Sequence, residues 1–376
     1  MTAVPTTETV HDQLAKILDP EIRRPITDLG MVRSIDISER GEVIVGIDLT
    51  TPGCPLKSTI EASVKERVLA LPGVTQCRVE MGAMNEEQKQ ALREKLRGGV
   101  AEREVPFTKP GNLTRVYAVT SGKGGVGKSS VTANLAAAMA AQGLKVGVVD
   151  ADIYGFSIPR MLGVEHPPTK IDDMIVPPVA HGVKVISIGM FVPDNTPVVW
   201  RGPMLHRAVN QFLADVYWGD LDVLLLDLPP GTGDVAISVG QLLPNAEILV
   251  ITTPQLAAAE VAERAGSIAG QTRQHVVGVV ENMSWLEQAD GSRLEIFGSG
   301  GGQQVAQRLS DLLGYQVPLS AQIPLEPRLR EGGDSGVPVA VGDPRCAAGT
   351  ALQDLARQLG HRARGLAGRS LGLTPQ

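Results

Sequence analysis

Short, almost wholly apolar runs recur along the chain after residue 113 and are separated by longer amphipathic stretches. Such runs are typical of strands that are buried on both faces. Helical periodicity follows the first run, where Val131, Leu135 and Met139 recur at every fourth position, and a last helix is expected over 347–359. This alternation predicts an α/β fold with a mostly parallel sheet covered by helices on both faces. The predicted strands cover residues 115–120, 145–149, 183–188, 223–226, 248–252 and 275–280.

The first 97 residues carry a different, shorter pattern that predicts a small separate α/β unit. A polar-capped helix is expected over 7–18, and alternation over 43–49 predicts a strand. A helix face bearing Ile60, Val64 and Val68 follows. The remaining predicted elements are a strand near Val79 and a charged helix over 85–97.

A stretch rich in Gly, Pro and charge, without periodicity, separates the two patterns and is typical of a linker. We therefore expect a small domain at 1–97, the linker at 98–113, a larger domain at 114–365 and a flexible tail at 366–376.

Composition narrows the classes of function. A net charge of −6 argues against broad nucleic-acid binding. The three cysteines are too few and too scattered for a disulfide framework, which favours a reducing compartment. The first residues show no basic-then-apolar leader pattern, and no apolar run approaches the ~20 residues of a membrane span. We expect a cytoplasmic protein with no nucleic-acid partner and no stable membrane association.

One Gly-rich segment carries clear chemistry. Residues 122–129 match G-x-x-x-x-G-K-[ST] and lie between a predicted strand and a predicted helix, as a phosphate-binding loop requires. The glycines allow backbone N–H groups to surround phosphate oxygens, Lys128 supplies a catalytic charge, and Ser129 is expected to hold Mg²⁺. The predicted nucleotide-binding residues are Gly122, Lys123, Gly124, Gly125, Val126, Gly127, Lys128, Ser129 and Ser130.

A second lysine, Lys123, makes the loop K-G-G-x-G-K-[ST], which resembles the deviant Walker A ATPases. That resemblance implies that Lys123 takes part in catalysis by reaching the nucleotide of a partner subunit. It therefore implies an ATP-linked homodimer. A solvated loop lysine is the alternative.

Acids follow two of the predicted strands, where a phosphate-binding sheet needs them. Asp152 is the candidate that positions the attacking water, and Asp150 is either a structural acid or a magnesium-side partner. The run L-L-L-D-L-P-P-G-T-G-D has the form of a Walker B strand and switch loop, so Asp227 is expected to bind Mg²⁺ through water.

The choice between adenine and guanine is predicted from residues near the C-terminal end of the chain. Asn282 and the loop 323–326 lie where related ATPases hold adenine, which favours ATP over GTP. A guanine-type T-K-x-D at 169–172 precedes the Walker B strand instead of following it, so it is discounted.

Several segments together resemble the Mrp/ApbC family of iron–sulfur cluster carrier ATPases: VTSGKGGVGKSSVTANLA, VVDADIYGFSIPRMLG, VVWRGPM, LLLDLPPGTGD and EIFGSGGG. In the first 97 residues, DPE, TDLGMV and TTPGCPL resemble the MIP18-like (DUF59) domain that often precedes this ATPase. The resemblance implies a MIP18-like domain followed by a P-loop ATPase domain, with ATP and Mg²⁺ as cofactors. It also implies that iron–sulfur clusters are transferred to apoprotein clients.

One departure from the family affects the cargo. The C-x-x-C pair that binds a bridging cluster in many members is absent before E-I-F-G. Cys54, at the predicted start of a helix, is the best remaining iron–sulfur ligand, with a plain turn residue as the alternative. Cys77 and Cys346 are expected to be packing residues. Arg201 contacts phosphate, the dimer partner or only solvent.

Two other functions stay open. An adaptor in iron–sulfur assembly would use the same ATPase without carrying a cluster. A positioning or partition ATPase would need a lipid- or DNA-binding surface, for which the Arg-bearing tail from His361 is the candidate, although its glycines make a poor amphipathic helix.

Overall fold

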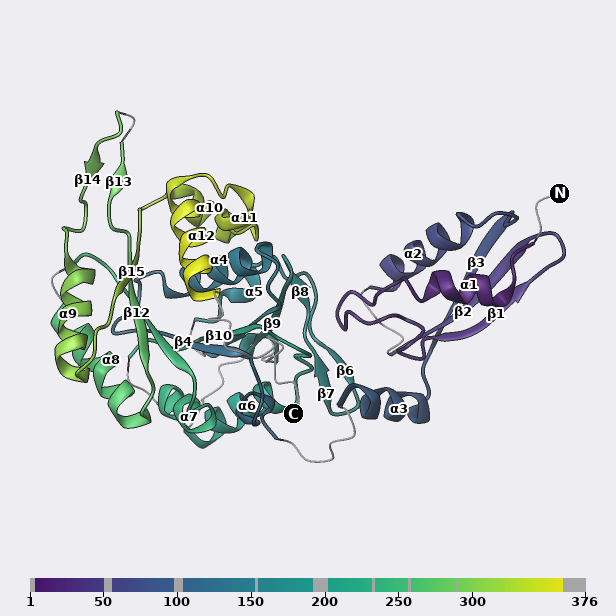
Figure 1. Cartoon of the computed structure of the whole chain (residues 1–376), viewed down its shortest axis with the longest axis horizontal. Coiled ribbons are helices and arrows are strands. Elements are labelled where there is room, and N and C mark those ends of the chain that lie inside the picture. The colour runs from purple at the N-terminus through teal and green to yellow at the C-terminus, as the bar shows by residue number, and fades with distance from the viewer. Residues whose placement is uncertain are drawn as a thin grey trace, which may run out of the picture.

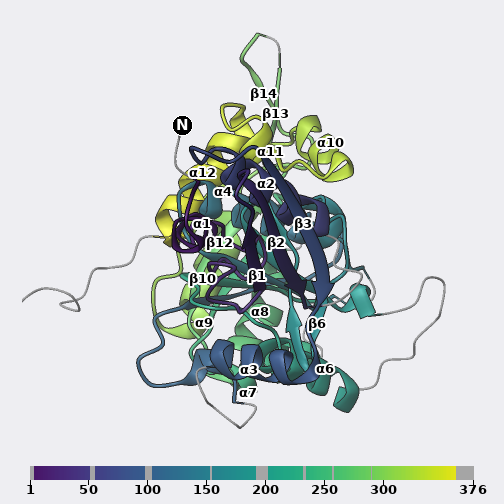
Figure 2. The same cartoon turned by 90° about the vertical axis from the view of Figure 1, so that its right-hand side faces the viewer.

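The computed structural model describes residues 4–50, 56–97, 104–152, 155–191, 202–231, 234–255, 258–288 and 290–360. It contains an N-terminal unit, residues 4–97, and a larger C-terminal unit, which lie side by side in Figure 1. In Figure 2 the three strands of the N-terminal unit lie in front of the larger unit.

The first two helices of the N-terminal unit pack against a three-stranded sheet of order β1-β2-β3, in which β1 and β2 are antiparallel and β2 and β3 are parallel. Its core includes Ile60, Val64 and Val68, which are buried as the helical spacing predicts. The elements are α1 Thr7–Leu14, β1 Val32–Ile37, β2 Glu42–Leu49, α2 Lys57–Leu69, β3 Gln76–Ala83 and α3 Glu86–Arg97.

The first helix ends earlier than residue 18, where the sequence placed its end. Leu18 instead forms a β-bridge with Pro25. The Asp19 carboxylate accepts hydrogen bonds from the backbone N–H groups of Glu21 and Ile22, at 3.0 and 2.8 Å, and this Asx-type turn leads from Leu18 back to Pro25.

The C-terminal unit is built on an eight-stranded sheet of order β15-β12-β11-β4-β10-β5-β9-β8. Every pair in it is parallel except β8 with β9, which confirms the predicted α/β class. The strands are β4 Arg115–Ser121, β5 Val146–Asp150, β8 Val179–Ala180, β9 Val183–Ser187, β10 Val223–Asp227, β11 Glu247–Thr252, β12 Val276–Asn282 and β15 Leu319–Ile323.

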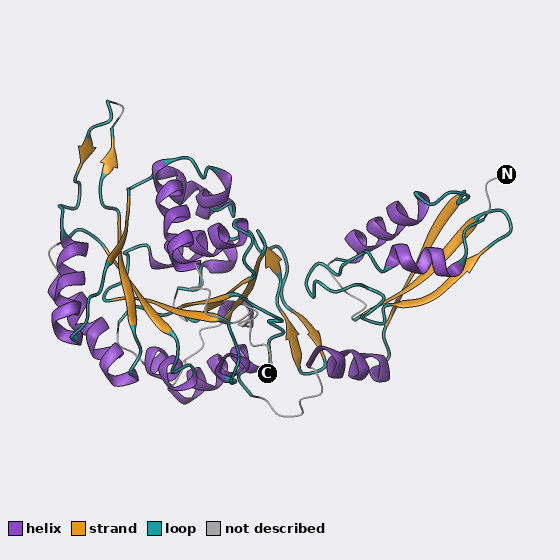
Figure 3. Ribbon diagram, in the orientation of Figure 1, coloured by secondary structure: helices purple, strands orange, loops and turns teal. Residues whose placement is uncertain are grey.

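Helices cover both faces of this sheet (Figure 3). One apolar core lies between the sheet and α6 to α9, and the other between the sheet and α4, α5, α11 and α12. The helices are α4 Lys128–Ala141, α5 Ile158–Met161, α6 Gly202–Ala214, α7 Asp234–Leu242, α8 Ala258–Thr272, α9 Gly301–Leu313, α10 Pro327–Ser335, α11 Val339–Gly342 and α12 Ala347–Gly360. In the described ranges, no helix combines the length and apolar character needed to cross a bilayer.

Two small hairpins extend from the larger unit. One, β13 Leu286–Glu287 with β14 Arg293–Leu294, projects from the molecule in Figure 1. The other, β6 Thr169–Ile171 with β7 Met174–Val176, packs into the N-terminal unit. Its residues Ile171, Met174 and Val176 are at most 2% exposed and belong to the same apolar cluster as the core of that unit.

Shortening one buried side chain of the β6–β7 hairpin tests this shared core. Ile171→Ala removes a fully buried side chain, so the free energy of unfolding should fall by about 2–5 kcal/mol in denaturant titrations. Leu294→Ala, in a residue 47% exposed on the other hairpin, serves as control and should change it by less than about 0.5 kcal/mol. Equal stability of the two variants would contradict the shared core.

Candidate functional site

The phosphate loop connects the end of β4 to the start of α4. Gly125 and Gly127 both have φ of 78°, a left-handed conformation that side chains resist. A Cβ added to Gly127 would lie 2.3 Å from the side-chain nitrogen of Asn282, so any larger residue there would displace the Asn282 amide. Val126 is buried, and its carbonyl accepts a 2.9 Å hydrogen bond from Asn282 Nδ2.

Three side chains of α4 converge on one carboxylate at the end of β10. Lys128 Nζ lies 2.8 Å from Asp227 Oδ1, and Ser129 Oγ donates to Asp227 Oδ2 at 2.6 Å. Thr132 Oγ1 also donates to Asp227, at 3.0 Å. A hydroxyl and a carboxylate side by side are hard oxygen donors of the kind that Mg²⁺ prefers, so these residues fit the predicted magnesium site.

The two acids after β5 differ in their surroundings. Asp150 is fully buried and accepts hydrogen bonds from the backbone N–H groups of Asp152 and Ile158 and from the Ser187 hydroxyl, at 3.2, 3.3 and 3.1 Å. Burial raises the pKa of Asp150 to about 7, and the nearby charge of Asp227 adds to the rise. Of the two roles left open for Asp150, this geometry favours the structural one.

Asp152 lines a cavity of about 220 Å³ above the loop, together with Lys128, Ser129 and Ser130. An acid in that place faces bound phosphates and can orient a water molecule for in-line attack.

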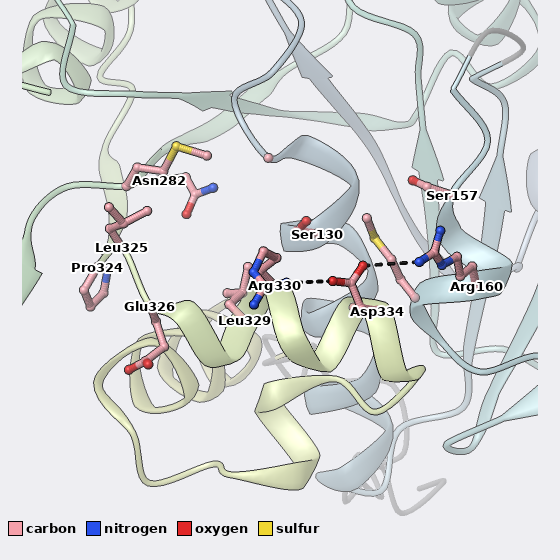
Figure 4. Close-up of a pocket in the computed structure, with 14 residues that line it drawn as sticks. Ser130, Ser157, Arg160, Asn282, Pro324, Leu325, Glu326, Leu329, Arg330 and Asp334 are labelled. Carbon is pink, nitrogen blue, oxygen red and sulfur yellow. Dashed lines mark hydrogen bonds and ion pairs between the residues drawn. The ribbon is translucent and has the colours of Figure 1, made fainter. Parts of the chain in front are cut away.

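A second cavity, of about 430 Å³, adjoins the first and shares Gly127 and Ser130 with it. Asn282 and the loop residues Pro324, Leu325 and Glu326 line this cavity (Figure 4). The structure therefore brings the predicted phosphate and base segments into one continuous site.

This second cavity is also lined by residues that no sequence motif indicated. Arg160 and Met161 come from α5, and Arg330 and Asp334 come from α10. Asp334 joins the two arginines, at 3.4 Å to Arg160 and 2.9 Å to Arg330 (Figure 4). No motif marks these positions, but α5 follows Asp152 and α10 follows the 323–326 loop, and that order could have pointed to them.

The discounted T-K-x-D segment lies elsewhere. Thr169 and Ile171 are buried in the β6–β7 hairpin. Lys170 and Asp172 line a different cavity, against α6.

The Lys123 side chain points away from the cluster around Asp227. Its side chain donates a hydrogen bond to Gln255, in the segment after β11. Within a single subunit it therefore contacts a neighbouring loop and not the cluster around Asp227.

Two of the three cysteines, Cys77 and Cys346, lie among the described residues. Cys54 and Arg201 lie outside the described residues. Cys346 is buried and Cys77 is half-buried, and burial raises the pKa of both thiols, in keeping with packing roles. Within the ranges that the structure describes, no group of three or more His, Cys, Asp or Glu side chains is placed to hold a metal ion. The segment before E-I-F-G, where the family resemblance implies a C-x-x-C pair, forms the β13–β14 hairpin, and the Arg293 guanidinium lies 3.9 Å from the centre of the Trp285 ring.

A parallel sheet, a phosphate loop between its strand and helix, and Asp227 at the end of the neighbouring strand define a P-loop nucleotide hydrolase. The ParA family, described as NUBPL iron-transfer P-loop NTPase, matches residues 112–360. A family described as iron-sulfur cluster assembly protein matches residues 7–81. The chain belongs to the iron-transfer P-loop NTPase family and carries an iron–sulfur assembly domain before it, which confirms the resemblance seen in the sequence.

Individual relatives agree with the family. The chain is 63% identical over 366 residues to the iron-sulfur cluster carrier protein of Mycobacterium tuberculosis, covering 97% of this chain and 96% of the relative. It is 38% identical over 361 residues to the protein of that name from Synechocystis, covering 94% and 97%. A solved nucleotide-binding protein in complex with ADP, from Archaeoglobus fulgidus, shares 36% identity and a TM-score of 0.50, covering 60% of this chain and 86% of that one.

Asp152→Asn and Lys128→Ala should separate orientation of water from binding of phosphate. Asp152→Asn keeps the cradle intact, so kcat for ATP hydrolysis should fall about 10²-fold while KM changes little. Lys128→Ala removes the buried cation of the cradle, so both nucleotide affinity and kcat should fall. Phosphate release measured against ATP concentration gives both constants.

Lys145→Ala is the matched control, because that lysine side chain is 57% exposed and its ammonium pairs with Asp220 at the surface. Loss of affinity and turnover to the same degree in Asp152→Asn would instead make Asp152 a structural acid.

Proposed function

We propose that this chain is a cytoplasmic ATPase that works as a homodimer and transfers iron–sulfur clusters to apoprotein clients. The observation that carries the ATPase part is the convergence of Lys128 and Ser129 on Asp227 beneath the phosphate loop. The cargo rests on family membership, and on relatives that are named iron-sulfur cluster carrier proteins.

The chemistry follows from the parts of the site. Backbone N–H groups of the Gly-rich loop and the Lys128 ammonium offset charge on the transferred phosphoryl group. Ser129 and Asp227 would hold Mg²⁺, which supplies further charge neutralisation when bound. Asp152 accepts a hydrogen bond from the attacking water and aligns it.

Adenine is favoured by the way Asn282 is held. Its side-chain nitrogen donates one N–H to the Val126 carbonyl, which fixes the orientation of the amide, and the amide oxygen is the acceptor that a base can meet. An acceptor in that place suits the exocyclic amino group of adenine. Apolar walls at Pro324 and Leu325 give the base a face to pack against.

The homodimer gives Lys123 its role. In the ATP-bound dimer Lys123 leaves Gln255 and reaches the partner's phosphates, as the deviant Walker A resemblance implies. Dimerisation would then depend on nucleotide, and hydrolysis would change the geometry of the dimer and the release of cargo.

Lys123→Ala should therefore weaken dimerisation more than it weakens ATP binding, because the crossing ammonium is lost while the rest of the cradle stays. Sedimentation with a slowly hydrolysed ATP analogue measures the dimer, and equilibrium binding measures affinity. Gln255→Ala removes only the contact within the subunit and should leave the dimer at wild-type strength or above it. An undiminished dimer in Lys123→Ala would contradict the role.

Cluster binding is tested through the cysteines, since a cluster needs about four soft ligands, usually thiolates. Each subunit has only Cys54, Cys77 and Cys346. We expect anaerobic reconstitution to give a labile cluster, shared between subunits or with a client, that disappears in Cys54→Ser. Cys77→Ser is the control and should keep it.

A stable cluster in a chain lacking both Cys54 and Cys346 would contradict this ligand choice. No cluster under any condition would favour the adaptor, an interpretation supported by the missing C-x-x-C.

A further inference from the structure

The phosphate loop is held at its start by α8. Gly122 is buried, and its carbonyl accepts a 2.6 Å hydrogen bond from Arg264 Nη1. A Cβ added to Gly122 would lie 2.6 Å from the Cα of Val261, so the backbone of α8 packs directly against this glycine. Arg264 therefore satisfies the carbonyl of a buried loop residue at the point where helix and loop are in contact.

The other end of the loop is held by Asp227, and the middle is open. Lys128 and Ser129 bind Asp227, as described above. Gly124 and Gly125 are exposed, and in the described part of the chain no heavy atom beyond their chain neighbours lies within 4 Å of a Cβ added to either. The loop is thus fixed at both ends and open between them.

Lys123 directly follows the end that Arg264 fixes, and its backbone is held more firmly than its side chain. The Lys123 carbonyl accepts a 3.0 Å hydrogen bond from Ser121 Oγ, and the residue before it is held by α8. The Lys123 ammonium contacts the exposed side chain of Gln255. A hydrogen bond at the surface contributes little net free energy, because water replaces it. The side chain can therefore leave Gln255 while the backbone keeps its place.

Arg264 contributes more at the loop than at the surface of α8. Its side chain is 48% exposed, and Nη2 lies 3.6 Å from a carboxylate oxygen of Glu260, whose side chain is 73% exposed. Exposed ion pairs of this kind add little to stability. A guanidinium that donates to the carbonyl of a buried residue makes a stronger bond, because its charge strengthens the bond and burial limits competition from water. The contact with Gly122 is therefore the one whose loss should be felt.

We propose that Arg264 is a positioning residue for Lys123: it fixes Gly122 so that the next side chain, that of Lys123, is directed toward the nucleotide of a second copy of this chain. The proposal rests on the proposed ATP-linked homodimer. Arg264 acts on assembly of that dimer and on turnover within it. Nucleotide binding inside one subunit stays with Lys128 and Ser129.

The test uses the full chain with Arg264→Ala, which removes the guanidinium and suits a helix. Sedimentation with a slowly hydrolysed ATP analogue gives the dissociation constant of the dimer, and equilibrium binding to the dilute chain gives the Kd for nucleotide. We expect the dimer to weaken about three- to tenfold, since a two-fold dimer contains two such lysines and loses both positions. The Kd for nucleotide should stay within about twofold of the wild type.

Turnover provides a readout that general loss of structure would not produce. At low protein concentration, ATP turnover per subunit of Arg264→Ala should fall with the dimer, and it should return toward the wild-type value as the concentration is raised. Arg264→Lys keeps a charged donor and should restore most of the dimer.

Two further variants of α8 serve as controls. Gln271→Ala changes an exposed side chain in the last turn of the same helix and should leave the dimer and turnover unchanged. Glu260→Gln removes the surface ion pair but keeps Arg264, and it should also resemble the wild type.

Three results would overturn the proposal: an undiminished dimer in Arg264→Ala, an equal loss of nucleotide affinity, or turnover that higher concentration and Arg264→Lys both fail to restore. Lys123→Ala measured alongside separates this failure from that of the proposed function. A dimer weakened by Lys123→Ala but not by Arg264→Ala contradicts only the role of Arg264. A dimer unaffected by Lys123→Ala contradicts the crossing lysine itself.

Discussion

The site depends on one buried carboxylate. Asp227 lies at the end of β10, fully buried, and an ionised acid in that place is tolerated only with cationic or hydrogen-bonding partners. Lys128, Ser129 and Thr132 supply them from the first turns of α4. This cluster fixes the start of α4 against β10. The position of that helix in turn sets the glycine-rich turn from β4, so the phosphate cradle and the proposed metal ligands are both fixed by Asp227.

The order of the parallel strands brings the other residues of the site close to Asp227. Strand order places β4 between β10 and β11, with β5 beyond β10, so the acids after β5 and β10 meet the loop after β4 at one edge. Burial raises the pKa of Asp150, and the register that pairs Asp150 with Asp227 adds the charge of a second carboxylate to that rise. On the far side of β4 from β10, the paired strands β12 and β15 bring Asn282 and Pro324 to the 430 Å³ cavity.

Much of this arrangement could be predicted from sequence, because it is local. The phosphate loop, Asp152 and Asp227 each follow an apolar strand. A few consecutive residues therefore indicate both the chemistry of the site and the turn of the backbone. The edge strand β15 was missed because its sequence, LSAQI, is half polar and only its last residue is buried. The burial of Asp19, Glu21 and Lys184 was missed because charged residues are usually exposed and no periodicity marks these three. Likewise, nothing local links Lys123 to Gln255 or Arg160 to Asp334.

The central claim is that the loop, the Asp227 cluster and the Asn282 cavity form a single ATP site. A crystal structure of the chain with Mg²⁺ and a non-hydrolysable ATP analogue tests it most directly. We expect Mg²⁺ about 2.1 Å from Ser129 Oγ, the γ-phosphate beside Lys128 and Asp152, and adenine against Asn282 and Pro324. A nucleotide bound elsewhere, or a metal held without Ser129 and with no water link to Asp227, would contradict it.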